Sequence, residues 1–241
     1  MRTSFRSLIS VAALSLALLA CGSDKPSSVT EVAADSGVAA DTASASASDG
    51  SAAGSNVGAV VCPPADGSAK KAQSFASEPP ICIDAAKTYV ASFETNQGAF
   101  AVTLDAKKAP KTVNSFVFLA RNHYFDDTVC HRVVKGFVVQ CGDPTASGTG
   151  GPGYTIEDEL PTEPYKIGSL AMANTGQPHT GGSQFFLITG AQGVALPPNY
   201  SLFGQLTKGD DLIPKLDSLA GGGDGPPTQE IRITKVTITE S

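Results

Sequence analysis

The stretch CHRVVKGFVVQCGDP, residues 130–144, decides the fold of its region and raises the question of function. Two short apolar runs flank Lys135-Gly136, which predicts a β-hairpin that turns at this pair. Arg132 is charged although its run is otherwise apolar, and the stretch offers no evident nucleophile or base. The chemistry to look for therefore uses a fixed positive charge and no proton shuttle.

The composition limits the classes of partner. The 241-residue chain carries 17 Lys and Arg against 23 Asp and Glu, which gives a net charge of −6. A chain with this balance has no basic surface for phosphate backbones, so we expect no nucleic-acid partner.

Residues 1–21 are typical of a targeting segment. Arg2 and Arg6 precede the apolar run Leu8–Ala20, and small residues precede Cys21. The run is too short to span a bilayer comfortably. The residues LLAC that end at Cys21 resemble a bacterial lipobox, so we expect lipidation of Cys21 and an extracytoplasmic, membrane-anchored lipoprotein of the bacterial cell envelope. An ordinary secretory signal peptide cleaved nearby is the alternative.

Residues 22–58 form a linker of Ala, Ser, Gly, Asp, Thr and Val without amphipathic period. Such a segment cannot bury enough apolar surface to offset the entropy lost on ordering, so we expect a disordered spacer. A cysteine-containing extension, residues 59–87, follows it.

Four cysteines remain after Cys21, an even number in a chain with an export signal. The predicted hairpin brings Cys130 opposite Cys141, within the distance of a disulfide, which leaves Cys62 to pair with Cys82. The alternative is a metal site that includes His131 or His123. It is disfavoured because the neighbouring strand residues Cys130 and His131 point to opposite faces.

Residues 88–241 read as the folded domain. Residues 88–95 and 98–104 flank an Asn-Gln-Gly turn, which predicts a second hairpin, and residues 109–124 show helical spacing. We expect further strands at 130–134, 137–141, 168–173, 184–189, 201–206 and 229–238, and a short helix after residue 211. This pattern has no βαβ rhythm, so we expect a mainly β fold: a closed eight-stranded antiparallel β-barrel capped by two α-helices.

Two motifs point to chemistry that their context does not support. GTGGPG at 148–153 satisfies a dinucleotide-binding pattern, but it contains a proline and no amphipathic helix follows. GGSQFF at 181–186 lacks the second glycine of a serine hydrolase elbow. A lone histidine is more often a surface or hydrogen-bonding group than a ligand or base, so we assign no catalytic role to His123, His131 or His179.

Three blocks of the sequence together resemble the cyclophilin-type peptidyl-prolyl cis-trans isomerases. They are CHRVVKGFVVQCGDP with GTGGPGY, then GSLAMANTGQPHTGGSQFFLITG, then LPPNYSLFGQLTKG, and the resemblance covers about residues 88–241. It implies that Arg132 is catalytic. It also implies nine substrate-binding residues: Phe137, Val138, Phe186, Leu196 and Tyr200 around the proline ring, and Gln140, Ala173, Asn174 and Gln184 along the peptide groove.

The resemblance also implies how these residues act. Gln140 would bond the substrate backbone, and Asn174 would hold the peptide through its main chain. The alternatives are an ordinary strand-surface arginine at 132 and plain core roles for Phe137 and Phe186.

The chain departs from the family pattern at several positions. Val138 stands where many members have methionine, Ala195 where eukaryotic members have tryptophan, and Tyr200 where they have histidine. The loss of the indole puts tight cyclosporin binding in doubt. Cys141 replaces a glycine, which fits the expected disulfide, and LPPNY at 196–200 replaces the acidic-glycine turn that is usual at the pocket rim.

An isomerase of this kind answers the question that Arg132 raises. Rotation about an X-Pro bond breaks no covalent bond and needs no proton transfer, so a fixed guanidinium is sufficient. We therefore expect an isomerase that acts on exported, proline-containing polypeptides as a monomer and requires no cofactor. A non-catalytic chaperone or adaptor that uses the same groove is the alternative.

Overall fold

The computed structural model describes residues 57–241 of the chain. The main sheet contains nine strands: β3 (Tyr89–Thr95), β4 (Gly98–Leu104), β5 (Thr128–Val129), β6 (Arg132–Val134), β7 (Val138–Cys141), β8 (Ser169–Met172), β9 (Phe185–Ile188), β10 (Leu202–Lys208) and β11 (Arg232–Glu240). Their order across the sheet is β5-β11-β3-β4-β10-β8-β9-β7-β6, and every neighbouring pair is antiparallel. Within the described residues, three helices accompany it: α1 (Pro110–Arg121), α2 (Ala191–Val194) and α3 (Leu212–Ser218).

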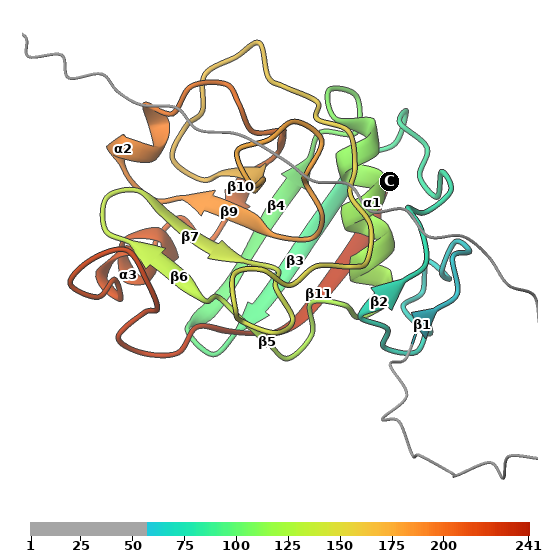
Figure 1. Cartoon of the computed structure of the whole chain (residues 1–241), viewed down its shortest axis with the longest axis horizontal. Coiled ribbons are helices and arrows are strands. Elements are labelled where there is room, and N and C mark those ends of the chain that lie inside the picture. Colours follow the sequence, from blue (N-terminus) through green and yellow to red (C-terminus); the bar gives the residue numbers. More distant parts are fainter. Residues whose placement is uncertain (1–56) are drawn as a thin grey trace, which may run out of the picture. The chain divides into compact units, whose positions relative to one another are not determined.

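The expected closed eight-stranded barrel is wrong, because the sheet curls into a half-barrel and stays open between β5 and β6 (Figure 1). These end strands are consecutive in the chain, yet they do not pair. The outer edge of β6 is occupied by the loop that precedes β11: the Val133 N–H donates to the Gly225 carbonyl oxygen at 2.8 Å. A single-turn helix, α2, was also not expected, because four residues are too few to show a helical period.

The main core lies between the sheet and α1. The ring of Phe116 on α1 lies 5.3 Å from that of Phe203 and 5.6 Å from that of Phe185, between ring centroids. Pro110 begins the helix, and no side chain of the preceding residue caps it. The Glu159 carboxylate does so from a distant loop, because it accepts the backbone N–H groups of Lys111 and Thr112 at 3.0 and 2.8 Å. Strands β9 and β10 are thus packed against a helix whose amino end is fixed.

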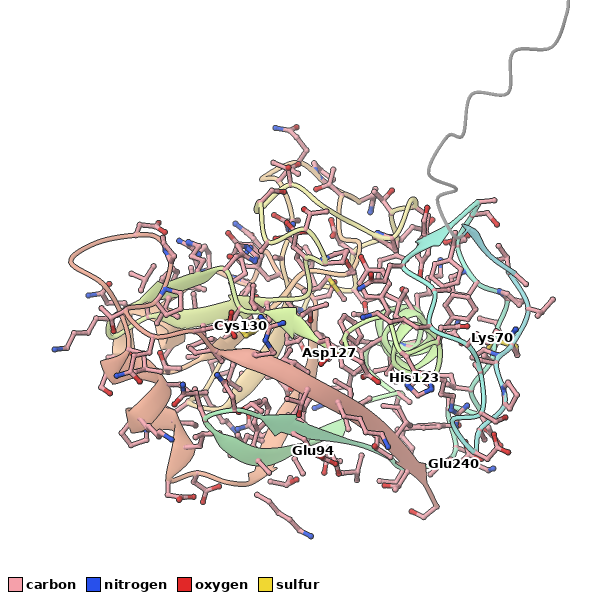
Figure 2. The ribbon with its side chains drawn as sticks, turned by 90° about the horizontal axis from the view of Figure 1, so that it is seen from below. Lys70, Glu94, His123, Asp127, Cys130 and Glu240 are labelled. Carbon is pink, nitrogen blue, oxygen red and sulfur yellow. A yellow bond between two sulfur atoms is a disulfide. The ribbon has the colours of Figure 1, made fainter. Side chains whose placement is uncertain are left out.

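The extension folds onto the outer side of α1, away from the sheet (Figure 2). Its strand β2 (Ser74–Phe75) pairs in parallel with β1 (Val57–Gly58), which lies just before the extension, and a disulfide joins Cys62 to Cys82. The ring of Phe75 meets that of Phe118 on α1 edge to face at 4.8 Å. Because of this cover, α1 is buried on every side from Thr112 to Arg121.

His123, labelled in Figure 2 near the end of α1, holds the extension at a second point. Its Nε2 lies 2.8 Å from the Gly67 carbonyl oxygen, and its Nδ1 lies 2.8 Å from the Asp126 carboxylate.

Two expectations lie outside the described residues: the targeting segment with the lipidation site Cys21, and nearly all of the linker. Val57 and Gly58, which the sequence assigns to that linker, form β1. Among residues 57–241, no helix has the length and apolar character needed to cross a membrane.

Candidate active site

The hairpin of β6 and β7 positions the central polar side chains. Its turn lies at Lys135-Gly136, where Gly136 takes the left-handed conformation with φ +72°, which favours glycine. The register places Arg132 directly opposite Gln140. A disulfide joins Cys130 to Cys141, with their Cα atoms 4.0 Å apart, and so fastens the open end of the hairpin beside these two residues. The pairing of all four cysteines is the one that the sequence suggested.

A hollow of about 230 Å³ opens beside this hairpin. Strands β6, β7 and β9, the turn between β6 and β7, and the segments that follow β8 and α2 contribute its nine lining residues: Arg132, Phe137, Val138, Gln140, Ala173, Asn174, Phe186, Leu196 and Tyr200. In the described part of the chain, Arg132 and Tyr200 are the ionisable side chains of this lining. The hollow therefore combines apolar walls with one permanent cation.

The floor of the hollow belongs to a small apolar cluster separate from the main core. Val138, Phe186 and Ile188 are buried in it. Tyr200 meets the Phe186 ring edge to face at 5.2 Å. The hydroxyl of the buried Tyr165 donates to the Tyr200 carbonyl oxygen at 2.7 Å and accepts the Tyr200 N–H at 3.0 Å, which fixes the loop that carries this wall.

Three partners hold the Arg132 guanidinium. Its Nε and Nη2 donate to the two carboxylate oxygens of Asp224 at 2.5 and 2.7 Å, and its Nη1 donates to Gln140 Oε1 at 3.0 Å. The guanidinium carbon lies 5.8 Å from the centre of the Phe137 ring, within cation–π range. The hydrogen bond to Asp224 raises the pKa of Arg132 and lowers that of Asp224, so both stay charged at neutral pH.

A hydrogen-bonded chain continues from Arg132 into a second hollow. Gln140 Nε2 donates to Gln184 Oε1 at 2.9 Å, and Gln184 Nε2 lies 3.0 Å from the carbonyl oxygens of Gly148 and Gly150. This second hollow has a volume of about 830 Å³, and three residues line both hollows: Gln140, Ala173 and Asn174. An extended chain can thus lie across both.

Asn174 uses its side chain for structure and leaves its main chain free. Its Nδ2 donates to the Asn199 carbonyl oxygen at 2.9 Å, and its Oδ1 accepts the Gly176 N–H at 3.0 Å. Within residues 57–241, its own backbone N–H and C=O form no hydrogen bond. These groups can pair with the backbone of an extended peptide.

Asp143 organises the glycine-rich loop that walls the second hollow. Its fully buried carboxylate accepts hydrogen bonds from Thr145, Ser147, Gly148 and Gly150. Burial alone would raise the pKa of Asp143, but these hydrogen bonds outweigh it and lower the pKa to about 2. A Cβ on Gly150 would lie 2.0 Å from the Asp143 carboxylate, so the loop requires glycine there. Gly150 of GTGGPG thus serves this close packing.

His131 is not part of the hollow. Both of its ring nitrogens are buried and lack a hydrogen-bond partner among residues 57–241, and burial lowers the pKa of the ring. The residues before and after it in the chain, Cys130 and Arg132, carry the disulfide and the guanidinium.

Nine of the ten residues predicted for catalysis and substrate binding line the first hollow, and the tenth, Gln184, lines the second. The sequence reasoning missed Asp224, Tyr165 and Asp143. Asp143 stands in the quoted stretch before a Gly/Ser/Thr loop, which is a usable signal for a carboxylate that binds backbone N–H groups. Asp224 and Tyr165 act through tertiary contacts that no local sequence pattern predicts.

Comparison with known proteins identifies relatives over this same region. A family model described as cyclophilin type peptidyl-prolyl cis-trans isomerase/CLD matches residues 90–238. The chain is 41% identical over 173 residues to the probable peptidyl-prolyl cis-trans isomerase B of Mycobacterium leprae, which covers 63% of this chain and 57% of that protein. It is 38% identical over 196 residues to its Mycobacterium tuberculosis counterpart, with 73% of this chain and 62% of that protein covered. The chain thus spans about three fifths of the length of these two relatives.

Solved structures agree with this relationship. The crystal structure of a cyclophilin type peptidyl-prolyl cis-trans isomerase of Cryptosporidium parvum superposes with a TM-score of 0.60 at 32% sequence identity. The match covers 64% of this chain and 99% of that one. The same parasite protein was also solved in the presence of the dipeptide Ala-Pro.

Proposed function

Since the chain belongs to the cyclophilin-type peptidyl-prolyl cis-trans isomerase family, we propose that it accelerates rotation about X-Pro bonds in proline-containing polypeptides. One observation carries the proposal: a single fixed guanidinium borders an apolar hollow, and among the described residues Tyr200 is the one other ionisable side chain that lines it. The Ala-Pro dipeptide used with the related parasite protein supports the same class of ligand.

Arg132 would act on the twisted amide. The barrier to rotation, about 18–20 kcal/mol, is lost amide resonance. As the bond twists, the prolyl nitrogen regains its lone pair and becomes a better hydrogen-bond acceptor. An arginine N–H that donates to this nitrogen binds the twisted state better than either planar state, which is the condition for catalysis. About 5 kcal/mol of such selective binding gives an acceleration of about 10³ to 10⁴.

The remaining residues would hold the substrate. Phe137, Phe186 and Leu196 would contact the proline ring, and the free backbone groups of Asn174 would pair with the preceding residues. Gln140 is already shared between Arg132 and Gln184, so it would align the cation with the bound peptide backbone.

The test is a protease-coupled assay with a Pro-containing peptide on the purified protein. We expect the Arg132→Ala variant to lose about 2–4 kcal/mol of transition-state stabilisation, or about 30- to 1,000-fold in kcat/KM. Arg232→Ala is the matched control, because Arg232 also forms a side-on ion pair, with Glu230, but does not line the hollow. Equal rates for Arg132→Ala and the unmodified protein would contradict the mechanism.

A non-catalytic role as a Pro-peptide-binding chaperone or adaptor is the second candidate. The second hollow favours this role, because it is larger than the first and its size suits an extended chain. Refolding of a protein limited by proline isomerisation separates the two. An enzyme accelerates refolding in trace amounts, whereas a binding protein acts only at stoichiometric ones.

We also propose that the protein acts on exported clients, as a monomer anchored outside the cytoplasm through a lipidated Cys21. Two disulfides within residues 57–241 support an oxidising compartment. Partition of the protein expressed in bacteria between detergent and aqueous phases tests the anchor. The unmodified chain is expected in the detergent phase and Cys21→Ala in the aqueous one.

A further inference from the structure

Asp224 lies beside the first hollow, next to its lining residue Arg132, and binds the guanidinium of Arg132 through both carboxylate oxygens. We propose that Asp224 is a positioning residue for the isomerase reaction: its carboxylate fixes the plane of the Arg132 guanidinium beside the hollow. This inference rests on the proposed isomerase function and adds to it a residue that touches no substrate.

The backbone places Asp224 there. The loop between Leu219 and Thr228 is closed at its base, where the Thr228 N–H donates to the Leu219 carbonyl oxygen at 2.7 Å. Its far end docks on β6 through the bridge between Val133 and Gly225. Val133 follows Arg132 and Gly225 follows Asp224 in the chain, so this single bridge brings the two charged residues together. The loop is GGGDG around Asp224, and the carboxylate is the one side chain that this tip presents.

The pattern of donors explains what the pair achieves. A guanidinium has five N–H groups in one rigid plane. Two of those on Arg132 bond Asp224 and one bonds Gln140, which leaves two for a substrate. A side-on carboxylate pair defines both the position and the tilt of the plane, whereas the single bond to Gln140 leaves rotation about that bond open. Asp224 thus decides where the two remaining N–H groups lie.

Orientation outweighs charge in this reaction. Asp224 neutralises part of the field of Arg132, which would weaken binding to a developing anion. The prolyl nitrogen of the twisted amide is a neutral acceptor, however, and its hydrogen bond depends on alignment more than on net charge. A held arginine also loses no rotamer entropy when the substrate reaches the twisted state.

The pair contributes little to folding, which makes the proposal testable. The Asp224 side chain is 62% exposed and that of Arg132 is 29% exposed, and ion pairs this accessible to water contribute little to stability. Removal of the carboxylate is therefore expected to leave the thermal midpoint of the protein nearly unchanged.

The experiment compares Asp224→Ala, Asp224→Asn and the unmodified protein in the peptide assay. We expect Asp224→Ala to lower kcat/KM by about tenfold. Asp224→Asn, whose single carbonyl oxygen can accept from one arginine nitrogen, is expected to fall between. Glu230→Gln is the matched control: it disturbs the other side-on pair, on Arg232, which lies outside the hollow, and is expected to match the unmodified protein.

Two further readouts separate positioning from a general effect on the loop. In the Arg132→Ala background, assayed at raised protein concentration, Asp224→Ala is expected to cause no further loss, because its effect passes through the missing guanidinium. In NMR spectra, the Arg132 Nε–H signal is expected to shift in Asp224→Ala while those of Arg121 and Arg232 stay in place.

The outcomes are distinct. An unmodified protein without activity refutes the isomerase proposal, and this inference falls with it. An active protein whose Asp224→Ala variant is equally fast or faster refutes the positioning role alone. A loss that persists in the Arg132→Ala background also refutes it. If Asp224→Ala fails to fold, Asp224→Asn, which keeps the side-chain shape, decides by the same criteria.

Discussion

Asp143 is a single side chain on which a wall of the second hollow depends. We expect Asp143→Asn to lower the free energy of unfolding at neutral pH by about 2–4 kcal/mol, because an amide nitrogen would face backbone N–H groups that now donate to a carboxylate. Chemical denaturation of the two proteins measures this difference. Asp210→Asn, at an exposed position, is the control.

The same carboxylate makes stability depend on pH with a defined sign. Its pKa is lowered in the folded protein from 3.8 to about 2, so its contribution is complete above pH 3.8 and is lost as pH falls toward 2. The difference between the Asp143→Asn variant and the unmodified protein is therefore expected to shrink as the pH falls from about 3.8 toward 2. A constant difference across this range would contradict the assignment.

Individual site residues differ in how far the sequence could predict them. Phe137, Gln140 and Arg132 belong to one quoted stretch, and the register of its hairpin brings them together. Asp224 lies 92 residues from Arg132 and joins it only through the docking of a glycine loop on β6. Pairings of that kind depend on tertiary structure and leave no local signal.

The β6–β7 hairpin is the element that carries the proposed catalysis, and the Cys130–Cys141 disulfide fastens it. We expect Cys130→Ala/Cys141→Ala to lose about 2–4 kcal/mol of unfolding free energy, because the bridge restrains the unfolded chain. The variant is also expected to lose part of its kcat/KM, since Arg132 and Gln140 lie beside the bridge.

Cys62→Ala/Cys82→Ala is the control for that experiment. It removes a disulfide from the extension, away from the hollow, and is expected to change stability but not kcat/KM. If both pairs of substitutions affect activity equally, the disulfide near Arg132 has no special role in alignment.

At the level of strands and helices, hydrophobic periodicity and turn residues were sufficient to predict the longer elements. The predicted strand at 184–189 is observed as β9, Phe185–Ile188, and the helical spacing of 109–124 as α1. The two-residue strands β1, β2 and β5 and the single turn α2 were missed, since elements this short show no period. The predicted closure of the sheet was wrong. Closure depends on which backbone group pairs with the outer edge of β6, and that group is the carbonyl of Gly225 rather than a strand.

For the molecule as a whole, the extension is part of the folded structure. Phe75 is buried against Phe118, so we expect Phe75→Ala to lower the free energy of unfolding by about 3–5 kcal/mol. Ile81→Ala, in the same extension but 72% exposed, is the control and is expected to change it by less than about 0.5 kcal/mol. Thermal or urea unfolding measures both. Similar values for the two variants would show that the extension does not support α1.

The position of β11 sets a condition on how the protein is made. This strand pairs with β3 on one side and β5 on the other, so one edge of the β3–β4 hairpin and the whole of β5 remain unpaired until residues 232–240 are available. During synthesis, when a chain emerges from its amino end, the sheet cannot be completed before residues 232–240 have emerged. Until then the sheet presents open strand edges to other chains, and a fold closed this late is exposed to aggregation while it is being made.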